Sequence, residues 1–462
     1  MMKLNTKHIY LLLVLIFAFQ LILLINLKFT AWPEMTLWPY LIIKGWLPYQ
    51  NIAIAHTPLM LMPLSLVYGI FGTGIIQLKI FTWILILGAD VLIFGVVKKL
   101  WNVKTALISV MFYGLWMMVY DGNGLWFDLA LVPLSISLFY LVYQKKYFAS
   151  GILWGLTFLT KQTTIWFLIP VFLSVIKDLN ILRRPLKGDP CKVVGTFILG
   201  AFVILLLFII ALLIFGILPD FWNWAVNFGI FVLPKAQGQI QLPDLKNLIV
   251  SVFPFLIFIP LIWKTGRKNI NLLMWAIAGS LGAYPRFEYF HFQPAIPFLA
   301  LATGIFFSTK FSKSILIKSF LTFYLLGSIY LFGGFFMRNF KEGVRFYESD
   351  VKGVVTYVKS NTNPGDRIFV MNWWDNIYAL SDRLPSVDPW IPQLSWYMET
   401  LGIQEKMVED LKVSKPKLII LNSYSETGLS AYIPQKVYNY VIANYKLKEK
   451  VDGIEILVPK KY

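Results

Sequence analysis

The feature that most constrains the fold of this 462-residue chain is a series of long apolar segments. A membrane-spanning helix needs about 20 mostly apolar residues, because its backbone must satisfy its own hydrogen bonds across a hydrocarbon core about 30 Å thick. Eleven segments meet or approach this length, and we predict that each is a transmembrane helix. They lie near residues 9–27, 77–97, 104–120, 127–143, 147–160, 163–177, 193–217, 247–263, 270–284, 294–309 and 315–336.

Composition and charge agree with a membrane protein. Hydrophobic residues make up 58% of the chain and charged residues 14%, whereas soluble proteins carry about 25% charged residues. Residues 1–340 hold 26 Lys and Arg against 9 Asp and Glu, while residues 341–462 hold 16 against 15. The excess positive charge therefore lies in the apolar part, where cytoplasmic loops retain cations, and it gives no support for nucleic-acid binding.

The distribution of Lys and Arg predicts the orientation. Residues 58–71 are apolar but too short to span and contain two prolines, so we predict a helix that lies flat at the interface. With that helix outside the bilayer core and the N-terminus inside, 18 Lys and Arg residues fall on the cytoplasmic side and 7 on the other side, up to residue 337. This topology places the C-terminal part outside the cytoplasm.

The chain after residue 340 has a different pattern. Short β-rich runs occur at 367–373, 417–423 and 454–459, and helix-like stretches at 350–360, 395–413 and 434–445 alternate with them. The predicted fold class is thus an α-helical polytopic membrane protein with about 11 transmembrane helices and a C-terminal extracytoplasmic α/β domain. We place the transmembrane domain at 1–340, with a first outer loop at 28–76, and the α/β domain at 341–462.

Glu34 is the first candidate for a chemical role, because it is the only acid in the predicted outer loop 30–60 and lies among aromatic residues. A carboxyl in apolar surroundings has a raised proton affinity, which suits a general base. The alternative is an acid at the start of a helix beginning near Pro33, where it complements the helix dipole.

Three cations in the same predicted outer region are candidates for binding an anion: Lys161, Arg286 and His291. Arg offers a planar pair of donors and Lys a point charge, so together they could surround a phosphate. Alternatively, Lys161 extends to lipid head groups, and Arg286 pairs with Glu288 to hold a turn. The sequence leaves both possibilities open.

Four short motifs, in this order and topology, resemble membrane glycosyltransferases of the GT-C superfamily. They are K-G-x-L-P-Y at 44–49, T-P-L at 57–59, F-L-T-K-Q-T at 158–163 and R-F-x-x-x-H at 286–291. The nearest group is the family 39-like enzymes, which include protein O-mannosyltransferases and lipid A aminoarabinose transferases. The resemblance covers essentially the whole chain.

The resemblance implies a polyprenyl-phosphate-linked sugar as donor, transfer outside the cytoplasm with inversion, and an acid of the first outer loop as general base, which is Glu34 by position. Many members have two acids there, whereas this chain has Pro33 before Glu34. Substrate binding is implied for residues in or beside the motifs: Lys44, Tyr49, His56, Lys161, Gln162, Arg286 and His291. A divalent metal is possible, but no metal ligand set is evident.

The implied partners are the lipid-linked sugar, membrane lipids and an acceptor that is a protein, a lipid or a polysaccharide. The expected location is the cell membrane, as a multi-pass protein. Two other classes stay open at this point: a multispan transporter or flippase of a lipid-linked or small polar substrate, and a non-catalytic assembly factor. The absence of an evident inverted repeat and the long first outer loop argue against a transporter.

Overall fold

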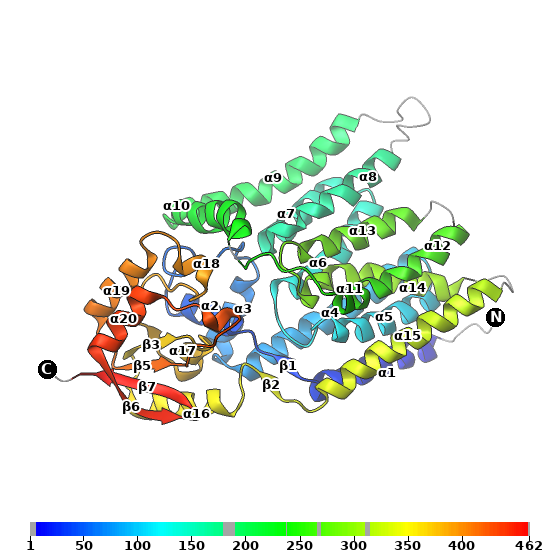
Figure 1. Ribbon diagram of the computed structural model, residues 1–462. Helices are drawn as coiled ribbons and strands as arrows, with labels where there is room; N and C mark the ends of the chain where they lie inside the picture. The colour runs from blue at the N-terminus through cyan, green and yellow to red at the C-terminus, as the bar shows by residue number, and fades with distance from the viewer. Residues whose placement is uncertain (1–5, 179–189, 237, 266–268, 310–314, 461–462) are drawn as a thin grey trace. The chain divides into compact units, whose positions relative to one another are not determined.

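The computed structural model describes residues 6–178, 190–236, 238–265, 269–309 and 315–460, which form two compact units (Figure 1). The first unit comprises Met1–Phe29, Thr82–Ile210 and Gln241–Glu342. The second comprises Thr30–Phe81, Ala211–Ile240 and Gly343–Tyr462.

The first unit is helical. Its longer helices are α1 (Thr6–Asn26), α4 (Ile75–Leu100, which begins in the second unit), α5 (Val103–Val119), α6 (Phe127–Tyr143), α7 (Tyr147–Thr160), α8 (Leu168–Asp178), α9 (Pro190–Ile214), α13 (Ile270–Ser280), α14 (Ile296–Ser308) and α15 (Ile315–Asn339). Shorter helical turns are η1 (Gln162–Phe167), α11 (Leu245–Val252), η4 (Phe253–Ile257), α12 (Phe258–Thr265), η6 (Leu281–Ala283) and η7 (Tyr289–Ala295).

Each of the eleven predicted spans coincides with one apolar helix or with two or three consecutive helical segments. Six segments within the described residues are long and apolar enough to cross a bilayer: Lys7–Asn26, Ile75–Leu100, Cys191–Ile214, Leu245–Thr265, Tyr289–Ser308 and Ile315–Asn339. The other five predicted spans are shorter apolar helices, so the number of eleven stays a prediction. A helix is present within the predicted segment 58–71 as α3 (Leu61–Phe71), and its flat orientation at the interface stays a prediction.

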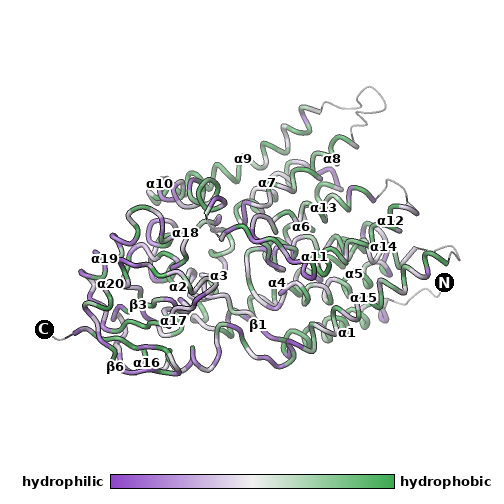
Figure 2. The backbone as a smooth tube through the Cα atoms, viewed as in Figure 1, coloured by the Kyte–Doolittle hydropathy of each residue, from purple (hydrophilic) through white to green (hydrophobic). Residues whose placement is uncertain are grey.

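Large apolar side chains are exposed along α1, α9 and α15, such as Val14, Leu207 and Ile329. Figure 2 shows these helices as mostly hydrophobic along their length. In water such surfaces would be costly, whereas in a bilayer they face lipid. The helical unit is therefore built for a membrane.

Small residues bring the helices of this unit together. A Cβ atom at Gly151 of α7 would collide with the backbone of α9 at Phe197, and one at Gly304 of α14 would collide with Ser109 of α5. Figure 1 shows α5 and α14 side by side. Close approach of small residues is the usual way in which membrane helices pack without a hydrophobic driving force.

The second unit contains a mixed sheet with strand order β4-β3-β5-β7-β6. β3 (Arg367–Met371) is parallel to β4 (Leu384–Pro385) and to β5 (Leu418–Leu421), while β7 (Ile454–Pro459) is antiparallel to β5 and to β6 (Tyr445–Val451). The helices that accompany the sheet are α16 (Ser349–Asn361), α17 (Asn376–Ser381), α18 (Ser395–Met398), α19 (Ile403–Ser414), η8 (Leu429–Ala431) and α20 (Gln435–Asn444).

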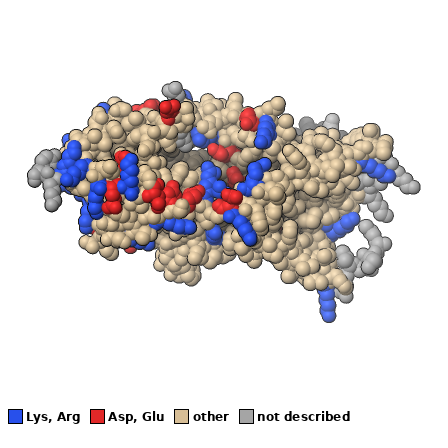
Figure 3. Space-filling view, turned by 60° about the horizontal axis from the view of Figure 1, so that its bottom comes forward, with Lys and Arg blue, Asp and Glu red and all other residues tan. Residues whose placement is uncertain are grey.

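The predicted α/β fold of the C-terminal segment is confirmed. The three predicted strands are β3, β5 and β7, and the predicted helices are α16, α18 with α19, and α20. β6 was missed, because its sequence YKLKEKV is mostly charged and exposed, as in an edge strand that avoids pairing with other chains. In Figure 3 the Lys and Arg atoms of this unit, at the left, are interspersed with Asp and Glu.

The second unit also contains Thr30 of β1 (Phe29–Thr30). Its further elements are α2 (Pro33–Ile43), α10 (Leu218–Phe221), the π-helix η2 (Trp222–Val232), η3 (Leu233–Lys235) and β2 (Val344–Arg345). Its core joins Ala53, Ala55 and Phe228 to residues of β3, β5, α19 and α20. Most of the predicted first outer loop thus folds together with the C-terminal segment. The domain boundary predicted at residue 340 stays a prediction.

Candidate functional site

The first unit holds a buried cluster of one acid and two basic groups. Lys161 Nζ lies 2.5 Å from Asp128 Oδ2 and 3.0 Å from His291 Nδ1, and His291 Nδ1 lies 3.1 Å from the same Asp128 oxygen. Lys161 is 2% exposed and Asp128 1%. A buried charge is costly unless it is paired, so the carboxylate and the ammonium hold each other in place.

Local structure explains how Lys161 comes to this position. α7 ends at Thr160, and Lys161 has an extended backbone with φ −158° and ψ 127° before η1 begins. Its carbonyl accepts a hydrogen bond of 2.9 Å from the hydroxyl of Thr164. The break between the two helical segments turns the lysine inward toward α6, where Asp128 lies in the first turn.

Arg286 lies in the loop between η6 and η7 of the same unit. The loop is held against residue 241: the Gln241 amide donates to the Pro285 carbonyl (3.1 Å) and the Phe287 amide donates to the Gln241 carbonyl (2.8 Å). The half-buried guanidinium interacts electrostatically with Glu288 and with His291. The structure therefore brings Lys161, His291 and Arg286 into one region, and Gln162 follows Lys161 as the first residue of η1.

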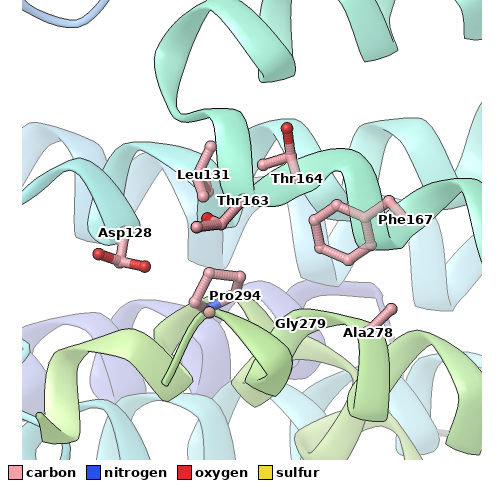
Figure 4. A pocket seen from close by; sticks show the side chains of 9 residues that line it. Asp128, Leu131, Thr163, Thr164, Phe167, Ala278, Gly279 and Pro294 are labelled. Atoms are coloured by element: carbon pink, nitrogen blue, oxygen red, sulfur yellow. The ribbon is translucent and has the colours of Figure 1, made fainter. Parts of the chain in front are cut away.

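A small cavity lies beside Asp128 (Figure 4). The space in which the centre of a water molecule can sit is about 10 Å³, which is room for about one water. Its lining residues are Asp128, Leu131, Thr163, Thr164, Phe167, Ala278, Gly279, Gly282 and Pro294.

The second unit holds Glu34 in the first turn of α2, directly after Pro33 at the first helical position. Its Oε2 atom is buried and has no hydrogen-bond partner among the described residues. Burial raises the pKa of the Glu34 carboxyl, and a hydrogen bond with the residue's own backbone opposes this in part. Proximity to a helix N-terminus would lower the pKa, so burial is the larger effect here.

Asp375 is a second acid near Glu34. It lies between β3 and α17, and its side chain forms a hydrogen bond with Trp390. The pKa of its carboxyl is well above the usual range because it is buried and because the negative charge of Glu34 acts on it. Two carboxyl groups therefore interact in this unit.

The remaining predicted residues of the second unit have local partners. Lys44 Nζ lies 2.8 Å from Asp382 Oδ1, and both side chains are substantially exposed. Tyr49 is buried and donates a hydrogen bond of 2.9 Å to the backbone carbonyl of His56. Tyr49 and His56 thus belong to one ordered loop, and their role in substrate binding stays a prediction.

Sequence reasoning did not single out Asp128 and Asp375 as candidate site residues. Asp128 had a usable signal, because an acid at the start of an apolar helix is expensive and usually has a partner. Asp375 follows a predicted strand in the run N-W-W-D-N, and the carboxyl end of a parallel strand is a common place for functional side chains. No group of three or more His, Cys, Asp or Glu side chains in the described residues could hold a metal ion.

Comparisons with known proteins agree with this architecture. Residues 55–215 match the family model of dolichyl-phosphate-mannose-protein mannosyltransferases. No curated protein sequence matches the chain.

Solved structures extend the likeness to nearly the whole chain. ArnT from Cupriavidus metallidurans in the apo state is 13% identical with a TM-score of 0.65, and the match covers 96% of this chain and 97% of ArnT. The same protein bound to undecaprenyl phosphate gives 12% identity and a TM-score of 0.62, over the same shares of the two chains.

The oligosaccharyltransferase AglB from Archaeoglobus fulgidus, in complex with an inhibitory peptide and a dolichol-phosphate, is 11% identical with a TM-score of 0.55, over 99% of this chain and 75% of AglB. At such low identity the likeness is one of fold. The resemblance expected from the motifs is confirmed: this multi-pass membrane protein has the fold of GT-C glycosyltransferases.

Proposed function

We propose that the protein transfers a sugar from a polyprenyl-phosphate-linked donor to a hydroxyl-bearing acceptor outside the cytoplasm. The match to ArnT supports this proposal, since it covers nearly all of both chains and one of the two ArnT structures is bound to undecaprenyl phosphate. The match to the mannosyltransferase family model over residues 55–215 supports it independently.

Glu34 is the general base in this proposal, and the observation that carries the assignment is its buried, unpartnered Oε2 atom. A base must accept a proton at an oxygen that is not already occupied, and its pKa must be closer to the working pH than that of a solvated carboxylate. Burial moves the pKa of Glu34 in that direction. Glu34 then takes the acceptor's proton as the acceptor oxygen bonds to the anomeric carbon.

The leaving group sets the second chemical requirement. A departing lipid phosphate takes the electrons of the bond to the anomeric carbon and needs positive charge rather than a proton. We assign this task to Arg286, whose half-buried guanidinium offers two parallel donors, with Lys161 and His291 beside it. Glu288 also acts on Arg286, but Lys161 is buried and held by Asp128 at 2.5 Å, so the half-buried Arg286 is the main phosphate ligand in this assignment.

The proposal also places the C-terminal α/β segment outside the cytoplasm. The asymmetry of Lys and Arg between the loops supports this location. So does the compact second unit, because the predicted first outer loop and the C-terminal segment fold into one body. The acceptor is a protein, a lipid or a polysaccharide.

The experiment that tests the proposal uses the full-length protein in lipid nanodiscs. Undecaprenyl-phosphate and dolichyl-phosphate hexoses and pentoses are supplied one at a time with three acceptors: a Ser/Thr-containing peptide, a glycolipid and an oligosaccharide. We expect release of free polyprenyl phosphate that depends on one acceptor. Consumption of a nucleotide sugar instead, or donor movement between leaflets without cleavage, would replace the proposal by another enzyme class or by a flippase.

A further inference from the structure

The starting observation is a cluster of aromatic side chains around an exposed arginine in the second unit. The guanidinium carbon of Arg345 lies 5.5 Å from the ring centroid of Trp32 and 4.7 Å from that of Phe346. The Phe346 ring contacts Trp374 edge-on with centroids 4.7 Å apart, and Trp373 lies beside Trp374 at 6.0 Å. We call Trp32, Arg345, Phe346 and Trp374 the arginine–tryptophan surface.

Hydrogen bonds to the backbone hold this surface in place. The Ala31 amide donates to the Arg345 carbonyl (3.2 Å), and the side-chain amide of Asn376 donates to the Phe346 carbonyl (2.6 Å). Phe346 has a φ of 66°, a left-handed conformation that bulky residues rarely adopt. Such a conformation persists only where the surroundings enforce it, and it is commonest at binding and catalytic sites. The chain around Arg345 is therefore fixed before a ligand binds.

Arg345 differs from the other two arginines of the second unit. The Arg367 guanidinium donates to the Pro385 carbonyl (3.1 Å). The buried Arg383 guanidinium donates to the Thr362 hydroxyl (2.7 Å). Arg345 is exposed, and within the described residues its guanidinium makes the two ring contacts but no ion pair or hydrogen bond. Because a guanidinium is planar and its N–H groups point outward in that plane, stacking leaves these donors available to an anion.

Trp374 supplies the apolar part of the surface. Its side chain is 39% exposed, although burial of an indole ring normally stabilises a domain. The loop that carries it is ordered, because the Asn372 side chain donates to the carbonyls of Asn422 (3.1 Å) and Ser423 (2.9 Å). An exposed aromatic ring in a fixed loop offers its negatively polarised face to the C–H groups of a sugar ring. The ring and the guanidinium together suit a saccharide that carries an acidic group.

The charges around the surface favour an anion with a single negative charge. Glu34 follows Trp32 by two residues, and Asp375 follows Trp374 directly. Arg345 therefore contacts, directly or through Phe346, two segments that each carry a carboxyl group. A phosphate monoester with nearly two negative charges would be repelled by these acids more strongly than a carboxylate. A carboxylate has one charge and matches the two parallel donors of one guanidinium.

We propose that the arginine–tryptophan surface binds the acceptor, and that the acceptor contains a sugar unit with a carboxylate group, such as a uronic acid. Arg345 binds the carboxylate through two parallel hydrogen bonds, while the sugar ring stacks on Trp374. The inference deepens the proposed function and rests on it for one point, namely that the bound saccharide is the acceptor. Because Trp32 directly precedes α2 and Glu34 lies in the first turn of that helix, the saccharide is bound next to the segment that carries the proposed base.

The first test measures binding without any donor sugar. The full-length protein in phosphatidylcholine nanodiscs is titrated calorimetrically with tetragalacturonate, with the neutral tetrasaccharide obtained by reducing its carboxyl groups, and with mannobiose 6-phosphate. We expect tetragalacturonate to bind most tightly, and Arg345→Gln to weaken its binding at least about tenfold, the usual loss for hydrogen bonds to a charged group. Arg345→Lys keeps the charge without the planar fork and should retain only part of the affinity. Arg367→Gln is the matched control, since it removes another exposed arginine of the same unit, and should bind like the native protein.

The aromatic ring and the guanidinium should act on different parts of the saccharide. Trp374→Ala should weaken the binding of tetragalacturonate and of its neutral counterpart by the same factor, whereas Arg345→Gln should affect tetragalacturonate alone. The proposal is overturned if the native protein binds the acidic and the neutral tetrasaccharide equally, if none of the three probes binds saturably, or if Arg345→Gln keeps the native affinity for tetragalacturonate. Tighter, Arg345-dependent binding of mannobiose 6-phosphate would show that the surface binds phosphate and that the assignment of a carboxylate is wrong.

A role in donor binding gives a different pattern. If Arg345→Gln weakens the binding of undecaprenyl phosphate but not of tetragalacturonate, Arg345 belongs to the donor site and the proposal is wrong. In transfer assays, Arg345→Gln should raise KM for an acidic acceptor and leave KM for the donor unchanged. Arg345-dependent binding of tetragalacturonate without transfer of any sugar would contradict the proposed function rather than the binding surface, so the two failures are distinguishable.

Discussion

The two units bury carboxyl groups in opposite electrostatic settings. In the first unit, Asp128 lies 2.5 Å from the Lys161 ammonium, and the two charges cancel. In the second unit, burial raises the pKa values of Glu34 and Asp375, and the negative charge of Glu34 raises that of Asp375 further; neither acid forms an ion pair among the described residues. The comparison separates a paired acid, which fixes a cation in place, from an uncompensated acid, which can exchange a proton.

The largest expected effect comes from the uncompensated acid. Glu34→Gln keeps the size of the side chain and removes the base, and we expect sugar transfer to fall about 10²–10⁴-fold, the usual contribution of general base catalysis. Thermal unfolding of the same preparation provides the control for folding. A folded Glu34→Gln variant with the native transfer rate would remove Glu34 from the mechanism.

Breaking the paired acid should instead damage stability. Lys161→Met leaves the buried Asp128 carboxylate without its ammonium partner and with only the His291 ring 3.1 Å away, and the loss of one partner of a buried ion pair costs about 3–5 kcal/mol. The double variant Asp128→Asn with Lys161→Met removes both charges, and we expect it to be more stable than Lys161→Met alone. Denaturation midpoints in nanodiscs measure the stabilities of the single and the double variant. If the double variant is no more stable than Lys161→Met, the unpaired Asp128 charge is not the source of the lost stability.

The pH dependence of stability should reveal the acid pair of the second unit. The folded-state pKa values of Glu34 and Asp375 lie above their ordinary values of 4.5 and 3.8. The contribution of the two acids to the free energy of unfolding is therefore fully present when the pH is below these ordinary pKa values, and it is lost as the pH rises through the folded-state pKa values. The native protein should therefore lose stability relative to Glu34→Gln with Asp375→Asn between pH 5 and pH 9. Unfolding temperatures of the native protein and the double variant at both pH values measure this difference in stability. A difference that is independent of pH would contradict the raised pKa values.

The smallest expected effect concerns the exposed ion pair of Lys44 and Asp382, whose side chains are 39% and 56% exposed. Solvent and salt screen such a pair, so Lys44→Met should change the free energy of unfolding by at most about 1 kcal/mol. If Lys44 binds substrate as the sequence predicts, the same variant raises KM for the donor or the acceptor. An unchanged KM for both would leave Lys44 with its ion pair alone.

Sequence patterns could predict the fold because the bilayer and the sheet impose simple periodicities. Apolar runs of about 20 residues predicted α1, α4, α9 and α15, and β-rich runs predicted β3, β5 and β7. β6 carries three Lys and one Glu at a sheet edge, where neither hydrophobicity nor β-branching is required. Such a strand has no distinctive local pattern.

The candidate site could be predicted only in part. Glu34 stood out as a single acid among aromatic residues, and Lys161, Arg286 and His291 as cations on the predicted outer side. Their partners could not be found in the same way, because Asp128 and Asp375 are brought to Lys161 and Glu34 by tertiary packing between segments distant in the chain. Local sequence carries no information about those pairings.

The most direct test of the central claim is the stereochemistry of the product. Nuclear magnetic resonance would determine the anomeric configuration of the glycoside formed from a polyprenyl-phosphate sugar of known configuration, together with the amount of polyprenyl phosphate released. A single displacement assisted by one base predicts an inverted product and one equivalent of released lipid phosphate. A retained configuration would contradict the assignment of Glu34 as a base, and intact donor after incubation with folded protein and all three acceptor classes would contradict sugar transfer itself.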